Sequence, residues 1–242
     1  MGLPVSLALR GRHTDDHQAL DAWGACVAQL REVDRVFSTY SDSFVSRLAS
    51  GQIGLGDCPP EVAEVLALGE QARVESGGAF DVRRPGPGGE RVLDPSGVVK
   101  GWAVQRAAGF FHALADTDFC LSAGGDMVCH VADDARPEWQ IGIEDPRNPS
   151  TITAVVPVRR GAVATSGHAH RGRHVVDART GSAPSAVASV TVVHADLVWA
   201  DIDATAAYAM GTEALTWLRT RPGRSGLVVW EDGTRDVFGE PH

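Results

Sequence analysis

The hydrophobic positions of the N-terminal third follow helical spacing, after one short alternating run. Residues 3–9 alternate as a strand does, and residues 15–37 are expected to form an amphipathic helix capped by Thr14-Asp15-Asp16. The apolar positions of this helix, three and four residues apart, are Leu20, Trp23, Val27, Leu30, Val33 and Phe37. A second helix is expected from Pro59 to about Glu75, because proline is tolerated in a first helical turn.

The pattern changes after residue 75. Residues 76–99 are rich in glycine and proline without a helical period, which predicts an irregular segment of the kind that is more often functional than idle. A helix-like stretch, 100–115, follows. Short strand-like runs then occupy 119–123, 127–132, 139–144, 152–158, 162–166, 174–178 and 186–195. A long helix is expected from Ala200 to Arg219, and residues 227–238 are expected to close the chain as a hairpin.

This order of elements predicts an α+β fold. Helices and strands alternate at first and strands then follow one another, which favours a mixed or antiparallel sheet with packed helices over a doubly wound parallel sheet. The sequence has neither an internal repeat nor a linker-like segment. We therefore expect residues 1–242 to form a single domain.

Composition narrows the class of protein. The chain is 43% hydrophobic with a net charge of −9, which excludes a disordered chain and argues against a nucleic-acid partner, since phosphate backbones require a positive surface. No apolar run reaches the roughly 18–20 residues of a membrane span. With no recognisable leader or lipid-attachment cysteine, a cytoplasmic location is expected.

The four cysteines, Cys26, Cys58, Cys120 and Cys129, are widely spaced and are interpreted as reduced packing residues.

Only one of the 22 basic residues is a lysine, Lys100. A GC-rich codon bias, which replaces lysine with arginine, explains the 21 arginines. The simplest interpretation of Lys100 is a solvated lysine beside a turn. The alternative is functional. Lys100 and Gly101 are expected at a helix start, where backbone amides and an ammonium group suit a phosphate.

Three further segments carry candidate chemistry. Residues 122–127 read Ser-Ala-Gly-Gly-Asp-Met, where two glycines allow close approach of a ligand to Asp126, or simply form a hairpin turn. Residues 163–181 offer hydroxyl groups at Thr165 and Ser166 beside Gly167. They also contain three histidines, His168, His170 and His174, whose spacing matches no closed zinc set. For His174, a role as general base, with the carboxylate of Asp177 nearby, is favoured over a role as metal ligand.

The last segment is residues 200–211. If a helix begins near Asp201, Asp201 and Thr205 share one face, and a carboxylate with a hydroxyl group suits Mg²⁺ that also holds phosphate oxygens. Asp203 lies on the other side of such a helix. Ordinary N-capping by either aspartate is the alternative.

Taken together, the ordered motifs resemble the ApbE-type flavin transferases, the FAD:protein FMN transferase family. The motifs are 31–48 (REVDRVFSTYSDSFVSRL), 77–82 (GGAFDV), 94–104 (DPSGVVKGWAV), 122–127 (SAGGDM), 139–146 (WQIGIEDP), 162–167 (AVATSG), 174–181 (HVVDARTG) and 200–205 (ADIDAT). Each motif is unspecific by itself, but eight of them in order are hard to obtain by chance.

The resemblance implies a T-fold-like core, FAD as substrate and Mg²⁺ as cofactor. The implied reaction transfers the FMN half of FAD to a Thr or Ser hydroxyl group of an acceptor flavoprotein and releases AMP. Some members instead, or also, hydrolyse FAD to FMN and AMP. A flavin-binding protein that has lost turnover is the third alternative.

The resemblance also implies roles for individual residues. The metal ligands are the Val99 carbonyl, Asp201 and Thr205, and the residues that act in catalysis are His174 and Asp201. The FAD-binding positions are Met1, Tyr40, Ser41, Gly78, Ala79, Phe80, Lys100, Asp126, Thr165, Ser166 and Gly167. Ala49, Gln105 and Ala178 depart from the residues usual in the family, and the first two bear on flavin or adenine contacts.

Overall fold

The fold is organised around a seven-stranded antiparallel sheet. The computed structural model describes residues 2–85, 88–168 and 175–240. The sheet has the order β1-β4-β5-β8-β9-β10-β11. Its strands are β1 (Val5–Gly11), β4 (Thr117–Ala123), β5 (Asp126–His130), β8 (Arg160–Gly167), β9 (Val187–His194), β10 (Ser225–Trp230) and β11 (Arg235–Phe238). Every neighbouring pair among these strands is antiparallel, which confirms the expected α+β class.

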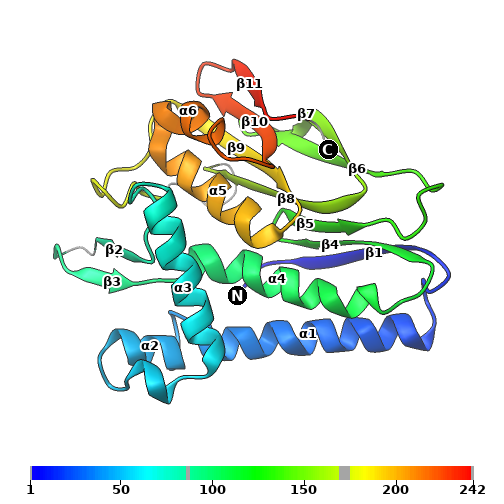
Figure 1. Cartoon of the computed structure of the whole chain (residues 1–242), viewed down its shortest axis with the longest axis horizontal. Coiled ribbons are helices and arrows are strands. Elements are labelled where there is room, and N and C mark those ends of the chain that lie inside the picture. The colour runs from blue at the N-terminus through cyan, green and yellow to red at the C-terminus, as the bar shows by residue number, and fades with distance from the viewer. Residues whose placement is uncertain (1, 86–87, 169–174, 241–242) are drawn as a thin grey trace.

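Helices cover one face of this sheet. They are α1 (His17–Phe37), α2 (Phe44–Ala49), α3 (Pro60–Glu75), α4 (Ser96–His112), α5 (Leu197–Met210) and α6 (Ala214–Leu218), with short 3₁₀ turns at Leu55–Asp57 and Gly211–Glu213. Figure 1 shows α4 and α5 lying across the sheet and α1 running alongside α4. No helix in the part of the chain that the structure describes is both long and apolar enough to cross a membrane.

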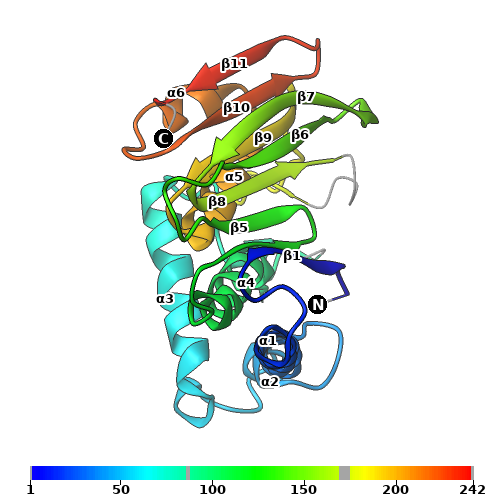
Figure 2. The same ribbon diagram turned by 90° about the vertical axis from the view of Figure 1, so that its right-hand side faces the viewer.

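The opposite face of the sheet is covered by a separate hairpin, β6 (Trp139–Asp145) with β7 (Asn148–Val158) (Figure 2). Ile141 and Ile143 of this hairpin pack against Val163, Val193 and Leu227 of the sheet. A larger core lies between the sheet and the helices and includes Phe111, Phe119, Leu121 and Ile202. The sheet is therefore buried on both faces, which explains why every residue of β9 from Val187 to Val193 is buried.

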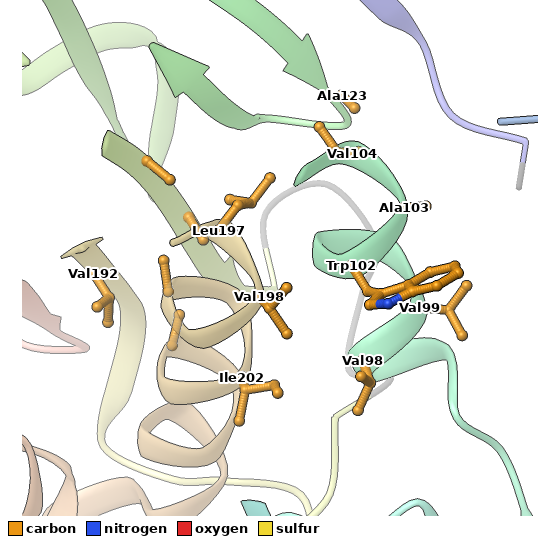
Figure 3. Close-up of a cluster of buried hydrophobic side chains, with 14 of the residues drawn as sticks. Val98, Val99, Trp102, Ala103, Val104, Ala123, Val192, Leu197, Val198 and Ile202 are labelled. Atoms are coloured by element: carbon orange, nitrogen blue, oxygen red, sulfur yellow. The ribbon is translucent and has the colours of Figure 1, made fainter. Parts of the chain in front are cut away.

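Close packing of α4 against α5 brings the candidate residues together. Figure 3 shows Val98 of α4 beside Val198 and Ile202 of α5. At the crossing, a side chain on Gly101 would place its Cβ 2.9 Å from the Leu197 carbonyl oxygen and 3.0 Å from the Cβ of Asp201. Glycine is required here because any larger residue would separate the helices and move Asp201 away from α4.

Several helix boundaries differ from the expectation. Helix α4 begins at Ser96, because the Pro95 carbonyl accepts from the amides of Val98 and Val99. Lys100 therefore lies one turn inside the helix, and its expected place at the helix start is wrong. Helix α5 begins at Leu197 with Asp196 as its N-cap, so Asp201 has no capping role.

Other elements also correct the sequence prediction. The long helix expected to Arg219 breaks at Gly211, which adopts a left-handed φ of 61° and lies against the Ser185 backbone. Residues 175–178 form no strand. The segment expected to be irregular contains a small hairpin, β2 (Arg83–Pro85) with β3 (Arg91–Leu93). The short helix α2 was also missed, and it is stabilised by a capping box between Ser43 and Ser46.

Candidate active site

A cavity of about 650 Å³ opens where α4, α5 and β8 approach the β6–β7 hairpin. Its volume is in the range of small-molecule and cofactor sites. Charged and hydroxyl groups from α4, α5 and β8 line one part, and apolar side chains from β5, β6 and β8 line another. The cavity therefore suits a ligand that has both a strongly polar segment and a flat or apolar one.

A buried charge cluster forms the polar part. The ammonium group of Lys100 lies 2.5 Å from Oδ2 of Asp126 and 3.0 Å from Oδ1 of Asp201. The second Asp201 oxygen, Oδ2, accepts from the Gly101 amide at 3.1 Å, and Asp126 Oδ1 accepts from the Thr165 amide at 3.3 Å. Both carboxylates are 1% exposed, so α4, α5, β5 and β8 meet at a single lysine.

The cluster holds two carboxylates against one ammonium group. Burial raises the pKa of Asp201 to about 7; Lys100 opposes this shift and Asp126 adds to it. Burial alone would lower the pKa of Lys100, but the two carboxylates outweigh it and raise the pKa to about 12. Lys100 is therefore charged at neutral pH, and a further cation bound beside Asp201 would favour the ionised form of its carboxyl group.

Hydroxyl groups adjoin this cluster along α5. Thr205 follows Asp201 by one helical turn, and its Oγ1 lies 3.0 Å from Oγ of Ser166 on β8. Both residues line the cavity with Lys100 and Asp201. Asp203 instead pairs with Arg221 and Arg224, away from the cavity. Asp201 and Thr205 thus line the cavity together, while Asp203 lies on another side of α5, as the spacing predicts.

The donor set fits a hard divalent cation. A carboxylate at Asp201 and a hydroxyl group at Thr205 provide oxygen ligands, and the carboxylate excess supplies the charge that such an ion requires. Among the described residues, no group of three or more His, Cys, Asp or Glu side chains forms a metal cluster. A metal here would rely on few protein oxygens and on ligand phosphates, which is the pattern of magnesium sites.

The apolar part of the cavity was not identified as a binding surface from the sequence. Met127 of β5, Ile141 and Ile143 of β6 and Val163 of β8 line it. The alternation of residues 139–144 was the available signal, because it places Ile141 and Ile143 on one face. The side chain of Tyr40, which is fully exposed, borders the cavity and offers a ring for stacking.

Two salt bridges lie at the border of the cavity formed by the β2–β3 hairpin. Arg84 of β2 pairs with Asp94 at 2.9 Å, and Arg91 of β3 pairs with Asp81 at 2.5 Å. Arg84, Asp81 and Asp94 line the cavity. No sequence pattern indicates a site role for Arg84, because only the β2–β3 hairpin brings this side chain to the cavity.

The structure brings most of the expected site residues together. Those that line the cavity are Tyr40, Ala79, Phe80, Lys100, Thr165, Ser166, Gly167, Asp201 and Thr205. Asp126 contacts Lys100 behind this lining. Ser41 is exposed next to Tyr40, Gly78 precedes Ala79, and Val99 is buried in α4 before Lys100. Met1, His170 and His174 lie outside the described residues.

The neighbours of His174 in sequence have structural contacts. Asp177 accepts from the backbone amide and the guanidinium group of Arg179, which also pairs with Glu213. This salt bridge holds Asp177 within the turn at 177–181, and its expected histidine partner, His174, lies outside the described residues. His168 lies 3.9 Å from Glu231.

Two positions that depart from the family pattern lie outside the cavity. Ala49 is exposed at the end of α2. The side chain of Gln105 accepts from the Leu197 amide at 2.9 Å and thereby supplies a hydrogen bond to the first turn of α5. Gln105 thus ties α4 to α5 about one and a half turns from Lys100, and it does not line the cavity.

Replacing Gln105 with alanine is expected to lower the free energy of unfolding by about 1 kcal/mol, the usual contribution of a side-chain cap. Urea denaturation measures this change. Gln18→Ala, at an exposed position on α1, is the matched control and should leave the urea midpoint in place. Equal midpoints for Gln105→Ala and the wild type would show that the bond to Leu197 adds nothing.

Comparison with known proteins places the chain in a family. The model of the ApbE family matches residues 1–84 and 84–228. An ApbE protein from Thermotoga maritima has a similar structure, with a TM-score of 0.82, 21% identity and coverage of 98% of this chain and 94% of that one. No curated protein sequence matches.

Two further solved structures show the same fold. The flavinyl transferase ApbE of Pseudomonas stutzeri in its apo form matches with a TM-score of 0.78 and 22% identity, over 98% of this chain and 95% of that one. The flavin transferase ApbE of Vibrio cholerae matches with a TM-score of 0.78 and 19% identity, over 98% and 96%. The family model spans most of the sequence, and the chain therefore belongs to the ApbE family.

Proposed function

We propose that this protein is a flavin transferase that moves the FMN half of FAD to a Thr or Ser hydroxyl group of an acceptor flavoprotein, with release of AMP. The observation that carries the proposal is the buried Lys100–Asp126–Asp201 cluster, which adjoins Thr205 and opens into an apolar cavity. Family membership supports it, as do the names of two of the similar structures.

The two parts of the cavity match the two kinds of group in FAD. The ammonium group of Lys100 would neutralise pyrophosphate oxygens, and the apolar surface of Met127, Ile141 and Ile143 would take a planar ring system. Tyr40 would stack on a ring at the entrance. Because binding excludes water from the cluster, its charges would act on the substrate more strongly than they would in solvent.

Asp201, Thr205 and the Val99 carbonyl are the proposed holders of Mg²⁺. When bound, the ion would withdraw charge from the pyrophosphate and make AMP a better leaving group. The chain's own contribution is to fix the ligand oxygens. Gly101 orients Asp201 through its amide, and Ser166 orients the hydroxyl group of Thr205.

The proposed reaction needs a base for the acceptor hydroxyl group. His174, which lies outside the described residues, is the proposed acceptor of that proton. The hydroxyl oxygen then forms a bond to the phosphorus on the FMN side, and the bond from this phosphorus to the oxygen shared with AMP breaks. The electron pair of that bond leaves with AMP, while Lys100 keeps its proton and its positive charge.

The proposal is tested with purified protein, FAD, Mg²⁺ and a flavoprotein domain carrying a flavinylation threonine. The expected result is a domain heavier by one FMN phosphoryl unit, with one AMP released per transfer. A domain whose threonine is replaced by valine is the control. Formation of FMN and AMP without an acceptor would favour the FAD pyrophosphatase alternative. Stable FAD binding without AMP would favour a flavin-binding protein.

Replacing Thr205 with valine tests the proposed magnesium ligands. Valine keeps the shape of threonine and removes its oxygen, so the Mg²⁺ concentration for half-maximal activity should rise about 10-fold. A magnesium titration of AMP release measures this shift. Thr212→Val, at an exposed position after α5, is the matched control. An unchanged titration curve for Thr205→Val would remove Thr205 from the ligand set.

A further inference from the structure

Two of the four cysteines lie against each other. Cys120 of β4 and Cys129 of β5 are directly opposite in the antiparallel pairing, and their sulfur atoms are 3.5 Å apart. Cys26 lies in the buried face of α1, and Cys58 follows a short 3₁₀ turn; neither has a cysteine opposite it. The structure thus sets one pair of thiols apart from the other two.

The hairpin geometry favours this pair. Gly124 and Gly125 form a two-residue turn, both with positive φ (60° and 95°), so the flanking pair Ala123 and Asp126 is the hydrogen-bonded kind. Pair types alternate along an antiparallel ladder, which makes Cys120 and Cys129 a non-hydrogen-bonded pair. Opposite Cα atoms in such pairs are about 4.5 Å apart, within the range that a disulfide can bridge.

The two thiols differ in access and in acidity. Cys129 is 2% exposed, whereas Cys120 is partly exposed at the border of the core between the sheet and the β6–β7 hairpin. Cys129 donates its S–H to the sulfur of Cys120, and this hydrogen bond lowers the pKa of Cys120 while it raises that of Cys129. Cys120 is therefore the thiol that a reagent meets and the one that ionises first.

We propose that Cys120 and Cys129 are an oxidisable thiol pair, which closes to an intramolecular disulfide when the folded protein meets a small-molecule disulfide such as oxidised glutathione. The Cys120 thiolate attacks one sulfur of the reagent, forms a mixed disulfide and releases the first glutathione thiolate. The deprotonated sulfur of Cys129 then attacks the Cys120 sulfur and releases the second. The protein loses two hydrogens, and the reagent is reduced to two thiols.

The product lies close to the candidate active site. Cys129 follows Asp126 by three residues on β5, and the turn at Gly124 and Gly125 lines the cavity. The disulfide would therefore cross-link the hairpin that presents Asp126 to Lys100. This inference is independent of the proposed function, since it concerns only the pair of sulfur atoms.

The test is peptide mapping of the folded protein after incubation with oxidised glutathione, followed by alkylation. Both cysteines fall in one tryptic peptide, 107–147, because Arg136 precedes a proline, whereas Cys26 and Cys58 fall in 13–31 and 48–73. We expect peptide 107–147 to be two hydrogens lighter and to take up no alkyl group. After dithiothreitol it should take up two. Alkylation of both thiols after oxidant treatment would overturn the proposal.

Single substitutions test the order of attack. Cys129→Ser should leave one glutathione attached to Cys120, because the second thiol is missing. Cys120→Ser should leave peptide 107–147 without glutathione, because the remaining thiol, Cys129, is buried. Cys58→Ser is the matched control and should form the disulfide as the wild type does. Glutathione retained on Cys120 in the wild-type protein would contradict closure of the pair.

Discussion

Asp201→Asn should reduce FAD turnover about 10³-fold, the loss typical of removing one group that stabilises a charged transition state. Asparagine keeps the volume of the side chain and an oxygen that can accept from the Gly101 amide. It removes the charge that faces Lys100 and that the proposed Mg²⁺ requires. The measurement is AMP release from FAD with and without Mg²⁺, together with the melting temperature of the variant.

The control for this substitution is Asp21→Asn, the same chemical change at an exposed position on α1. Its turnover should equal that of the wild type. If Asp201→Asn retained turnover at ordinary Mg²⁺ concentrations, Asp201 would have neither the metal nor the catalytic role. If it failed to fold, calorimetry would show this directly, and Thr205→Val would test the same site with a smaller change.

Lys100→Met should lower the free energy of unfolding by about 3 kcal/mol, since removing one partner of a buried ion pair leaves its carboxylates without compensation. Asp126 and Asp201 would face each other in a site where both are 1% exposed. Urea denaturation in metal-free buffer measures the loss. Arg35→Met, which removes an exposed salt bridge with Glu32, should leave the urea midpoint unchanged.

Lys100→Arg separates the charge of this residue from its shape. Arginine keeps the positive charge, but its planar guanidinium group is larger than the ammonium group that lies 2.5 Å and 3.0 Å from two carboxylates. We expect FAD to bind about 10-fold more weakly, as isothermal titration would measure. Equal affinity for FAD would show that a compact ammonium group is not required, and the single lysine would then be explained by codon bias alone.

Part of the candidate site followed from local spacing. Asp201 and Thr205 are four residues apart, and any helix through them places both on one face; the structure has that helix, although it begins at Leu197. The hairpin turn that was one of the two interpretations of Gly124 and Gly125 is also present between β4 and β5. These features depend on a few neighbouring residues, which is why the sequence sufficed.

The boundaries of the helices and the contacts between residues far apart in the chain could not be predicted from the sequence. The start of α4 depends on how Pro95 meets the amides of Val98 and Val99, and periodicity says nothing about that bond. The hydrogen bond from Leu197 to Gln105 joins residues 92 positions apart. The sequence marked Gln105 as a departure from the family pattern, and only the structure shows that its side chain accepts from the Leu197 amide.

The sequence by itself determined the α+β class, the order of most elements, the shared face of Asp201 and Thr205, and the resemblance to a family. Only the tertiary structure decided that Lys100 bridges Asp126 and Asp201, that Ile141 and Ile143 line the same cavity, and that Cys120 meets Cys129. The physical reason is that periodicity reports on which side of its own element a residue lies. Distances between elements depend on packing, here on the absence of a side chain at Gly101, which lets α5 approach α4.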